Sequence, residues 1–507
     1  MTTIDSNALW ARLEQAEPAR LADLFAAEAD RLERLTVDEA GILFDFSKTH
    51  LGVETLESFL ALAESTDLAA HREALFAGEI VNPTEGRPAE HSAERGEGAP
   101  GSVARARRFQ ARMRTLIDAI EAGAFGAVSS VIHVGIGWSA LGPELLVDAL
   151  GRGELRFDLS IVSNVDGAAL EMALADLDPH ETLLVIASKT FTTSETMLNA
   201  NSVIDWMMQG GVTDPYGRTV ALTASPDKAI EFGIDETRIL PFSESVGGRY
   251  SLWSSIGFPA ALALGWEAFE TLLEGAAAMD RHFRLAPPER NVPLLAAFVD
   301  RYYANVRGAE TRAVFAYDER LRLLPPYLQQ LEMESNGKSA RIDGAPVGRA
   351  TAAITWGGVG TDAQHAVFQL LHQGTHLVPV EFVAVIEPGD SLDLEHHRQL
   401  LANCFAQGAA LMAGRSSDDP HRFYPGDRPS TTILLDRLDA HSLGALIAFY
   451  EHRTFASAVL LGINPFDQFG VELGKEMAKR LDNQSALDFD PSTEALVARA
   501  FGAETDG

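Results

Sequence analysis

Short apolar runs alternate with amphipathic stretches along most of this chain, and that alternation constrains the fold more than any other feature. The first series of apolar runs comprises Val128–Val134, Leu159–Val165, Leu183–Ala187, Thr219–Thr223 and Arg238–Phe242, with helical patterns at Ser139–Leu150, Gly167–Leu177 and Ser194–Gln209. A second series comprises Ala313–Ala316, Ala352–Trp356, Leu377–Ile386 and Thr431–Leu435. Strands that are apolar throughout, each followed by a helix, are typical of a parallel sheet covered by helices on both faces. The pattern therefore predicts an α/β fold with two αβα sandwiches and mainly parallel sheets, plus N-terminal and C-terminal helices.

The chain has 507 residues, more than one core normally organises, since domains average about 150 residues. Residues 1–107 have helical patterns with polar breaks, such as Ala8–Ala16 and Thr36–Phe46. A break near Ala286-Pro287-Pro288 separates the two α/β series. We therefore expect an N-terminal helical segment at 1–107 that packs on the second domain, a first sandwich at 108–285, and a second sandwich with C-terminal helices at 286–507.

The chain is strongly acidic: 41 Lys and Arg against 72 Asp and Glu give a net charge of −31. Nucleic acids and anionic membranes both require a basic footprint, so neither is expected as a partner. A phosphate ligand would gain no long-range attraction from this charge, and its site must therefore be locally positive.

Cys404 is the only cysteine, which excludes an internal disulfide framework and a multi-cysteine metal site. A reducing cytoplasm is the expected location. No apolar run reaches the length of a membrane span, and Met1-Thr2-Thr3-Ile4-Asp5 lacks the basic and apolar regions of a signal peptide, so neither feature is expected.

Hydroxyl side chains and one lysine follow the apolar run Leu183–Ala187, in the segment Ser188-Lys189-Thr190-Phe191-Thr192-Thr193-Ser194. The segment lies at the predicted carboxyl end of a strand and just before a helix. Backbone N–H groups and the positive end of the helix are available to an anion at such a place. The pattern favours a phosphate cradle, with an ordinary helix cap and polar turn as the alternative.

A second strand-to-helix turn, Val134-Gly135-Ile136-Gly137-Trp138-Ser139-Ala140-Leu141-Gly142-Pro143, is opened by glycines. It is not a dinucleotide fingerprint, because the third glycine does not fall where that motif requires it. Glycine here also permits close packing of strand and helix. Ser139 at the helix start is either a cap or a ligand of sugar or phosphate oxygens.

Two further segments present charged side chains that suit anion binding and proton transfer. Arg249 directly follows two glycines, and its planar fork suits anionic oxygens, although a surface ion pair is the commoner fate of such an arginine. Gln330 and Glu334 are four residues apart near the end of a predicted helix, so they share a face. A partly enclosed carboxylate there can take a proton from carbon, and a solvated glutamate at the helix end is the alternative.

A histidine and a lysine complete the set of candidates. Thr361-Asp362-Ala363-Gln364-His365-Ala366 begins a predicted helix, with His372 seven residues after His365, and either histidine is alternatively a core residue. We find no metal-ligand spacing among His, Cys and carboxylates, so no metal site is expected. The run Asn464–Lys475 has a spacing that, in a helix, places Gln468 and Lys475 on one face about 10.5 Å apart.

Taken together, in order and content, these blocks resemble the glucose-6-phosphate isomerase (phosphoglucose isomerase) family. The resemblance runs from Phe44–Lys48 through Asn82–Arg95 to Lys475, and the stretches Ser245–Gly257 and Asn464–Lys475 are highly specific to the family. It implies sugar-isomerase-type sandwiches and the reversible conversion of glucose 6-phosphate to fructose 6-phosphate, in glycolysis and gluconeogenesis. It also implies a cis-enediol intermediate, no metal or organic cofactor, and a homodimer with active sites shared between subunits.

The resemblance implies a catalytic role for four residues. Glu334 looks like the base that moves a proton between C1 and C2. His365 is similar to the histidine that the neighbouring subunit donates to open the sugar ring, and Lys475 to the lysine that assists at the ring oxygen. Arg249 would stabilise the enediolate, an electrostatic role worth about 3 kcal/mol per donor in other enzymes.

The resemblance also implies how the phosphorylated hexose is held. Its phosphate would bind Ser188, Thr190 and Thr193 with Lys189 nearby. The sugar would be lined by Ser139, Gly248, Gln330 and Gln468.

Two positions depart from the family pattern. Trp138 stands where the family has a second glycine, so a bulky ring either narrows the pocket beside Ser139 or points into the dimer interface. Asp362-Ala363 replaces an Asn-Gly pair and adds a carboxylate near His365, which would raise the basicity of that histidine if the side chains approach each other.

Two other functions were weighed against the isomerase. A sugar-phosphate-binding regulator that has lost catalysis would have the Glu, His or Lys replaced, and all three are present. A phosphosugar transferase with a linked amidotransferase would require an N-terminal nucleophilic cysteine, whereas the only cysteine is Cys404. Activity on mannose 6-phosphate stays open, because it depends on the shape of the pocket.

Overall fold

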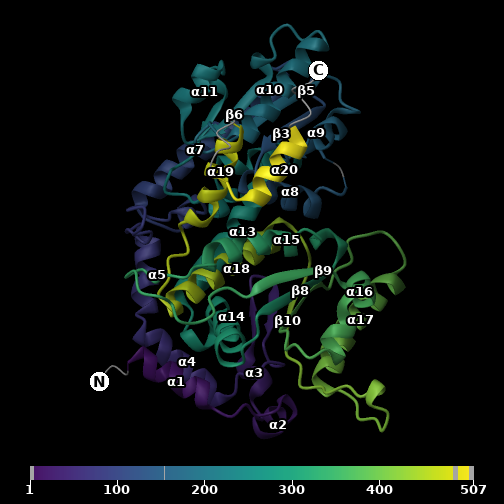
Figure 1. Ribbon diagram of the computed structural model, residues 1–507. Coiled ribbons are helices and arrows are strands. Elements are labelled where there is room, and N and C mark those ends of the chain that lie inside the picture. The colour runs from purple at the N-terminus through teal and green to yellow at the C-terminus, as the bar shows by residue number, and fades with distance from the viewer. Residues whose placement is uncertain (1–4, 154, 483–488, 502–507) are drawn as a thin grey trace. The chain divides into compact units, whose positions relative to one another are not determined.

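The computed structural model describes residues 5–153, 155–482 and 489–501, which fall into two compact units, Met1–Pro465 and Phe466–Gly507. The larger unit contains two sheets with helices packed against them (Figure 1). These elements confirm the α/β class predicted from the alternation of apolar and amphipathic stretches. The division into domains at residues 107 and 285 stays a prediction.

The first sheet consists of five parallel strands in the order β4-β3-β5-β6-β7. Their bounds are β3 (Ser130–Gly135), β4 (Asp158–Val162), β5 (Thr182–Ala187), β6 (Thr219–Thr223) and β7 (Ile239–Pro241). All five lie where the apolar runs predicted strands. The chain adds β4 on one side of β3 and β5 on the other, so the strand order reverses between β3 and β5. In open α/β sheets, ligands bind at the carboxyl ends of the strands at such a switch point.

Helices cover both faces of this sheet because its central strands have no polar face. Every residue of β3 and β5 is buried. Ile132, Val134, Leu184 and Ile186 form one core with side chains of α10, such as Val203. The helices and short turns of this part are α7 (Pro100–Glu121), α8 (Trp138–Leu150), α9 (Gly167–Leu174), α10 (Ser194–Gln209), η1 (Tyr216–Arg218), α11 (Pro226–Phe232) and η2 (Glu236–Arg238).

The second sheet has six strands in the order β1-β2-β11-β10-β8-β9. β8 (Thr311–Tyr317), β9 (Ile354–Val359), β10 (Val380–Val385) and β11 (Ser430–Leu435) are parallel, again where the apolar runs predicted strands. The helices and turns that follow the first sheet or belong to this part are η3 (Gly248–Trp253), η4 (Ser255–Gly257), α12 (Phe258–Leu264), α13 (Trp266–Leu285), η5 (Pro288–Arg290), α14 (Val292–Arg301), the π-helical turn η6 (Tyr302–Val306), η7 (Glu319–Leu321), α15 (Leu324–Asn336), α16 (Gly360–Gln373), α17 (Leu394–Ala413), η8 (Pro420–Arg422) and α18 (Ala440–Leu461).

The predicted helix at Thr36–Phe46 is wrong: this segment is a β-hairpin at the edge of the second sheet. β1 (Thr36–Glu39) pairs with β2 (Ile42–Asp45), and β2 runs antiparallel to β11. The two connecting residues, Ala40 and Gly41, both have positive φ angles, 55° and 75°. That geometry suits a two-residue hairpin turn, for which an Xaa-Gly pair is the usual signal. Pairing with the distant strand β11 determines the conformation of this segment, although its local sequence pattern predicts a helix. The helices around the hairpin are α1 (Ser6–Gln15), α2 (Leu21–Ala27), α3 (Arg31–Leu35), α4 (Val53–Ser65), α5 (Leu68–Ala77) and α6 (His91–Glu94).

α18 is buried around its whole circumference, from Ser442 to Leu461. It lies with α13 and α15 between the two sheets in Figure 1. Alternate residues of β10 point to opposite faces of the second sheet. Phe382 packs with the core under α16 and α17, whereas Glu381 accepts a hydrogen bond at 2.7 Å from Tyr450 of α18. Helices therefore cover both faces of this sheet as well.

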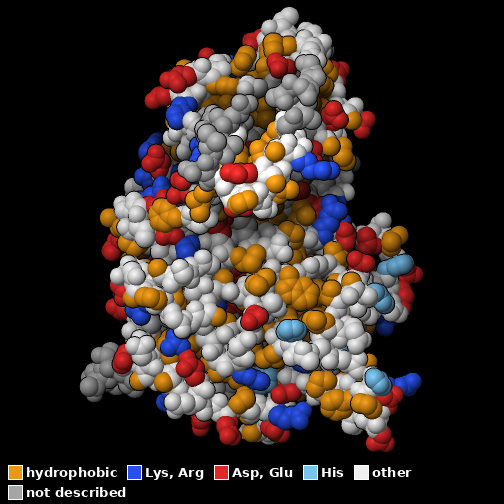
Figure 2. Space-filling view, in the orientation of Figure 1, with side chains coloured by type: hydrophobic (Ala, Val, Ile, Leu, Met, Phe, Trp, Pro, Cys, Tyr) orange, Lys and Arg blue, Asp and Glu red, His pale blue; other side chains and the backbone are white. Residues whose placement is uncertain are grey.

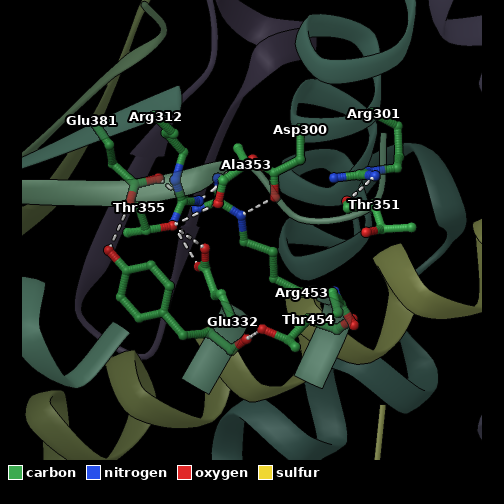
Figure 3. A network of polar contacts seen from close by, with 12 residues as sticks. Asp300, Arg301, Arg312, Glu332, Thr351, Ala353, Thr355, Glu381, Arg453 and Thr454 are labelled. Carbon is green, nitrogen blue, oxygen red and sulfur yellow. Dashed lines mark hydrogen bonds and ion pairs between the residues drawn. The ribbon is translucent and has the colours of Figure 1, made fainter. Parts of the chain in front are cut away.

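Buried charges connect the second sheet to three helices (Figure 3). Arg453 of α18 donates to Asp300 of α14 and to Glu381 of β10, each at 2.6 Å. Arg312 of β8 donates to Glu332 of α15 at 2.6 Å. Burial alone would raise the pKa of Asp300, but Arg453 and Arg312 lower it below its ordinary value. With Arg301, which is also buried, this network holds three cations and three anions.

Glu94 at the end of α6 is a buried carboxyl group, and its Oε2 has no hydrogen-bond partner among the described residues. Burial raises its pKa from 4.5 to about 8, against the opposing charge of Arg105 and with a contribution from Glu90. The folded state therefore keeps a proton that the unfolded state releases above about pH 4.5.

This pKa predicts a loss of stability as the pH rises from about 4.5 through about 8. Relative to wild type, Glu94→Gln should gain roughly 2–4 kcal/mol in the free energy of unfolding on going from pH 5 to pH 9, because the amide never ionises. Urea unfolding at both pH values measures the difference. Glu57→Gln, at an exposed position of α4, should show no such pH-dependent gain. Parallel pH curves for Glu94→Gln and wild type would contradict the prediction.

The smaller unit contains η9 (Phe469–Val471), α19 (Glu472–Asp482) and α20 (Pro491–Phe501). The prediction of one helix through Asn464–Lys475 is wrong for its first half. Gln468 precedes η9 with φ −154° and ψ 38°, outside helical geometry, and the α-helix begins only at Glu472. The helical distance of about 10.5 Å between Gln468 and Lys475 therefore does not apply.

Figure 2 shows acidic and basic side chains interspersed over the visible face. Several histidines lie over the region of α16 and α17 in the same view. None of the helices in the described ranges combines the length and the apolar character needed to span a membrane.

Candidate functional site

Two polar turns lie side by side at the switch point of the first sheet. Gly135 at the end of β3 pairs with Ala187 at the end of β5, so the turn after β3 and the segment Ser188–Thr193 after β5 are neighbours. Gly137 has a φ of 61°, and a Cβ there would lie 3.2 Å from Nε2 of Gln330. Glycine at 137 therefore permits both the left-handed turn and the close approach of α15.

The segment Ser188–Thr193 forms a compact loop with its hydroxyl groups close together. Ser188 Oγ lies 3.1 Å from Thr193 Oγ1, and Thr192 Oγ1 donates to Thr190 Oγ1 at 2.8 Å. Phe191 in the middle of the loop has a φ of 52°, an uncommon conformation for a bulky residue, and its buried ring packs against Phe232. Strained backbone of this kind is concentrated at ligand-binding sites.

Lys189 is the cation of this loop. Its Nζ donates to the backbone carbonyl of Glu244 at 3.0 Å, beyond the end of β7. Burial lowers the pKa of Lys189 to about 8, and the positive charge of Arg87 contributes to the same effect. The loop thus has the local positive charge that an anion site requires in so acidic a protein.

The carboxylate of Glu334 has donors on three sides. Trp138 Nε1 donates to Oε2 at 2.6 Å, and Gln330 Nε2 donates to the same oxygen at 3.1 Å. Arg249 Nη1 lies 3.5 Å from Oε1. The side chain of Glu334 is 16% exposed, so it is enclosed but reachable. As predicted from their spacing, Gln330 and Glu334 share one face of α15.

α15 ends next to this carboxylate because its last carbonyl groups find another partner. Lys338 Nζ donates to the carbonyl oxygens of Glu334 at 2.8 Å and Ser335 at 3.0 Å. A lysine just past a helix commonly satisfies the last carbonyls and complements the negative helix end. Lys338 thereby fixes the backbone that carries Glu334 at the end of α15.

Arg249 is buried rather than paired on the surface. Its Nε donates to Ser335 Oγ at 2.6 Å, and its Nη2 donates to the carbonyl of Pro465. η3, which carries Gly248 and Arg249, is anchored at its end by Trp253, whose Nε1 donates to Glu451 Oε1 at 2.8 Å. Ser335 and the backbone of Pro465 therefore hold the guanidinium of Arg249 beside Glu334 without a ligand.

His365 lies on an exposed part of α16 and faces a pocket of about 520 Å³ that is also lined by His372 and Tyr424. Within the described ranges, no hydrogen bond or ion pair joins His365 to Glu334 or to Asp362. The carboxylate that was expected to raise the basicity of His365 therefore does not bond to it within one chain.

Gln468 and Lys475 belong to the smaller unit. Lys475 lies in the first turn of α19 and is exposed. That these two residues join Glu334 in one site stays a prediction.

The fold brings most of the predicted residues of the larger unit together. The turns after β3 and β5 contribute Ser139, Ser188, Lys189, Thr190 and Thr193, the η3 region contributes Gly248 and Arg249, and α15 contributes Gln330 and Glu334. Sequence reasoning missed two contacts of this site, those made by Trp138 with Glu334 and by Ser335 with Arg249. The sequence indicates the bulk of Trp138, but no local pattern indicates a hydrogen bond to a residue 196 positions away. In residues 5–153, 155–482 and 489–501, no three His, Cys, Asp or Glu side chains are grouped so as to hold a metal ion.

The molecule is thus an α/β protein with two open sheets, whose polar loops gather at the switch point of the first. Its sequence matches the phosphoglucose isomerase family over residues 45–497, and the chain belongs to that family. It is 71% identical to a glucose-6-phosphate isomerase from Rhizorhabdus wittichii, over 98% of this chain and 100% of the relative, and 63% identical to one from Zymomonas mobilis, over 98% of each. The crystal structure of a glucose-6-phosphate isomerase from Chlamydia trachomatis matches with a TM-score of 0.89 at 31% identity, covering 99% of both chains.

Proposed function

We propose that this protein catalyses the reversible isomerisation of glucose 6-phosphate and fructose 6-phosphate through a cis-enediol. The observation that carries the proposal is the carboxylate of Glu334, enclosed among Trp138, Gln330 and Arg249. Membership of the phosphoglucose isomerase family and the hydroxyl-rich loop with Lys189 support the choice of a phosphorylated sugar.

In the proposed reaction, Glu334 is the base. It takes the proton from C2 of the open-chain aldose and returns it to C1, and Arg249 stabilises the negative charge that develops on the enediolate oxygen. Gln330 has a buried Oε1 without a partner among the described residues, which suits a hydroxyl group of the sugar. Ser188, Thr190, Thr193 and Lys189 bind the phosphate, and Ser139, Gly248 and Gln468 line the sugar.

His365 and Lys475 open the sugar ring in this proposal. His365 lines an open pocket of its own chain, and no hydrogen bond or ion pair joins it to Glu334 in the described part of the chain, which suits donation to a neighbouring subunit. We therefore propose a homodimer with two shared sites, in the cytoplasm, where a single buried cysteine, Cys404, stays reduced.

The activity is tested with the purified chain, fructose 6-phosphate and excess chelator, by following glucose 6-phosphate with a coupled dehydrogenase. We expect turnover that survives chelation. Absence of turnover by a folded, dimeric protein would overturn the isomerase assignment. Phosphate-sugar binding without turnover would instead favour the regulator considered above.

Mixing two inactive variants tests the shared sites. If Glu334→Gln and His365→Ala subunits exchange at random, half of the dimers contain one intact site, so roughly a quarter of wild-type activity should return. Native mass spectrometry of the mixture establishes that exchange has occurred. Mixed dimers without activity would mean that each subunit builds its site alone.

A further inference from the structure

The indole of Trp138 lies along the helix that carries Glu334. Its ring packs edge-on against Tyr327, with centroids 5.9 Å apart and planes at 88°, while its Nε1 donates to Glu334 Oε2 at 2.6 Å. Tyr327 and Glu334 are seven residues apart on α15 and therefore face the same side of the helix. The indole thus spans two turns of α15 and ends at the carboxylate.

The first sheet and the η3 region fix the position of this indole. Trp138 is the first residue of α8 and directly follows Gly137 at the end of the turn after β3. A Cβ on Gly248 would lie only 3.3 Å from Trp138 Cδ1, so the backbone of η3 borders the ring on another side. The indole therefore points into the site, and its neighbours hold it in place there.

The two oxygens of the Glu334 carboxylate have different surroundings. Oε2 accepts from both Trp138 and Gln330, whereas the group that approaches Oε1 among the described residues is Arg249, at the longer distance of 3.5 Å. The indole N–H is purely a donor, and a bond of 2.6 Å to a charged oxygen is short and strong. Oε1 is therefore the less engaged oxygen and the better placed to accept a proton.

We propose that Trp138 is a positioning residue of the isomerisation: its N–H holds Oε2 so that Oε1 carries the proton between C2 and C1. The inference rests on the proposed function. In the forward step the C2–H bond breaks, its proton goes to Oε1, and its electron pair forms the C1–C2 double bond while the C1 carbonyl pair moves onto O1. A proton then passes from the hydroxyl at O2 to O1. A lone pair on O2 forms the C2 carbonyl, and the electron pair of the C1–C2 double bond takes the proton from Oε1 to make the new C1–H bond.

Two substitutions separate hydrogen bonding from packing. Trp138→Phe keeps an aromatic ring against Tyr327 but has no donor. Trp138→His loses the six-membered ring, yet its Nε2–H occupies the ring position of the indole N–H. If the N–H positions the base, Phe should lower kcat roughly 10- to 100-fold with KM within about twofold, as a displaced reacting group does. His should then recover part of the lost kcat.

The deuterium isotope effect with C2-deuterated glucose 6-phosphate is the second readout. A mispositioned base makes proton transfer more nearly rate-limiting, so the isotope effect should rise in Trp138→Phe and fall back in Trp138→His. A general loss of folding would not produce this pattern. Trp266→Phe is the control, because Nε1 of that buried tryptophan has no partner among the described residues, and its kcat and isotope effect should equal those of wild type.

The outcomes distinguish this inference from the proposed function. An inactive wild type would overturn the proposed function. A fully active Glu334→Gln would show that Glu334 is not the base. An active wild type with an inactive Glu334→Gln, but with Trp138→Phe at wild-type kcat and isotope effect, would overturn the inference alone. A higher kcat for Phe than for His would assign Trp138 a packing role and would overturn it as well.

Discussion

Glu334→Gln is expected to lower kcat by about 10³-fold, within the range that a positioned general base contributes. The amide keeps the size of the carboxylate and an oxygen that can accept from Trp138, but it has no basic oxygen to take a proton from carbon. The coupled dehydrogenase assay at saturating fructose 6-phosphate measures the loss. Binding of substrate should change little, because the phosphate loop is untouched.

The same variant can also be tested for ring opening, a step that does not require Glu334 as the base. If His365 and Lys475 open the ring, the interconversion of sugar anomers, followed by NMR, should persist in Glu334→Gln. Glu319→Gln is a matched control on the exposed turn η7 and should retain wild-type kcat. Undiminished isomerisation by Glu334→Gln would show that another group is the base.

Arg453→Met should destabilise the fold by about 3–5 kcal/mol, because it leaves buried carboxylates without their cation. Arg453 is 2% exposed and is the common partner of Asp300 and Glu381. Urea unfolding followed by circular dichroism gives the free energy. Adding Glu381→Gln to Arg453→Met should recover part of the loss, since it removes one of the two orphaned charges.

A surface arginine provides the comparison for that prediction. Arg322 is 50% exposed and pairs with Asp148, so Arg322→Met should change the free energy of unfolding by no more than about 1 kcal/mol. Equal effects of the two substitutions would mean that the buried network of Figure 3 contributes no more than an ordinary surface pair.

The strands and the polar loops of the first sheet were predictable from the sequence because their signals are local. An apolar run such as Leu183–Ala187 has no polar face to expose, and the hydroxyl-rich segment after it marks the end of the strand. Since parallel strands end at one edge, side chains after β3 and β5 meet there. The order of the strands, and hence the switch point, comes only from the structure.

The errors fall where distant partners decide the local conformation. Thr36–Phe46 forms a hairpin because β2 pairs with β11, whose sequence lies near the other end of the chain. The spacing of Gln468 and Lys475 suits one face of a helix, yet Gln468 lies outside helical geometry and the α-helix begins only at Glu472. The contact of Trp138 with Glu334 likewise depends on how α15 approaches the first sheet. In each case, the deciding contact is remote in sequence.

The edge hairpin also sets an order of assembly during synthesis. The ribosome releases β1 and β2 long before β11, although Phe44 ends up opposite Ile433. The hairpin of the nascent chain must therefore avoid pairing with other strands until translation is almost finished and β11 has been made. Once formed, β2 covers the outer edge of β11, so a chain shortened at its start would leave that strand as an open template for aggregation.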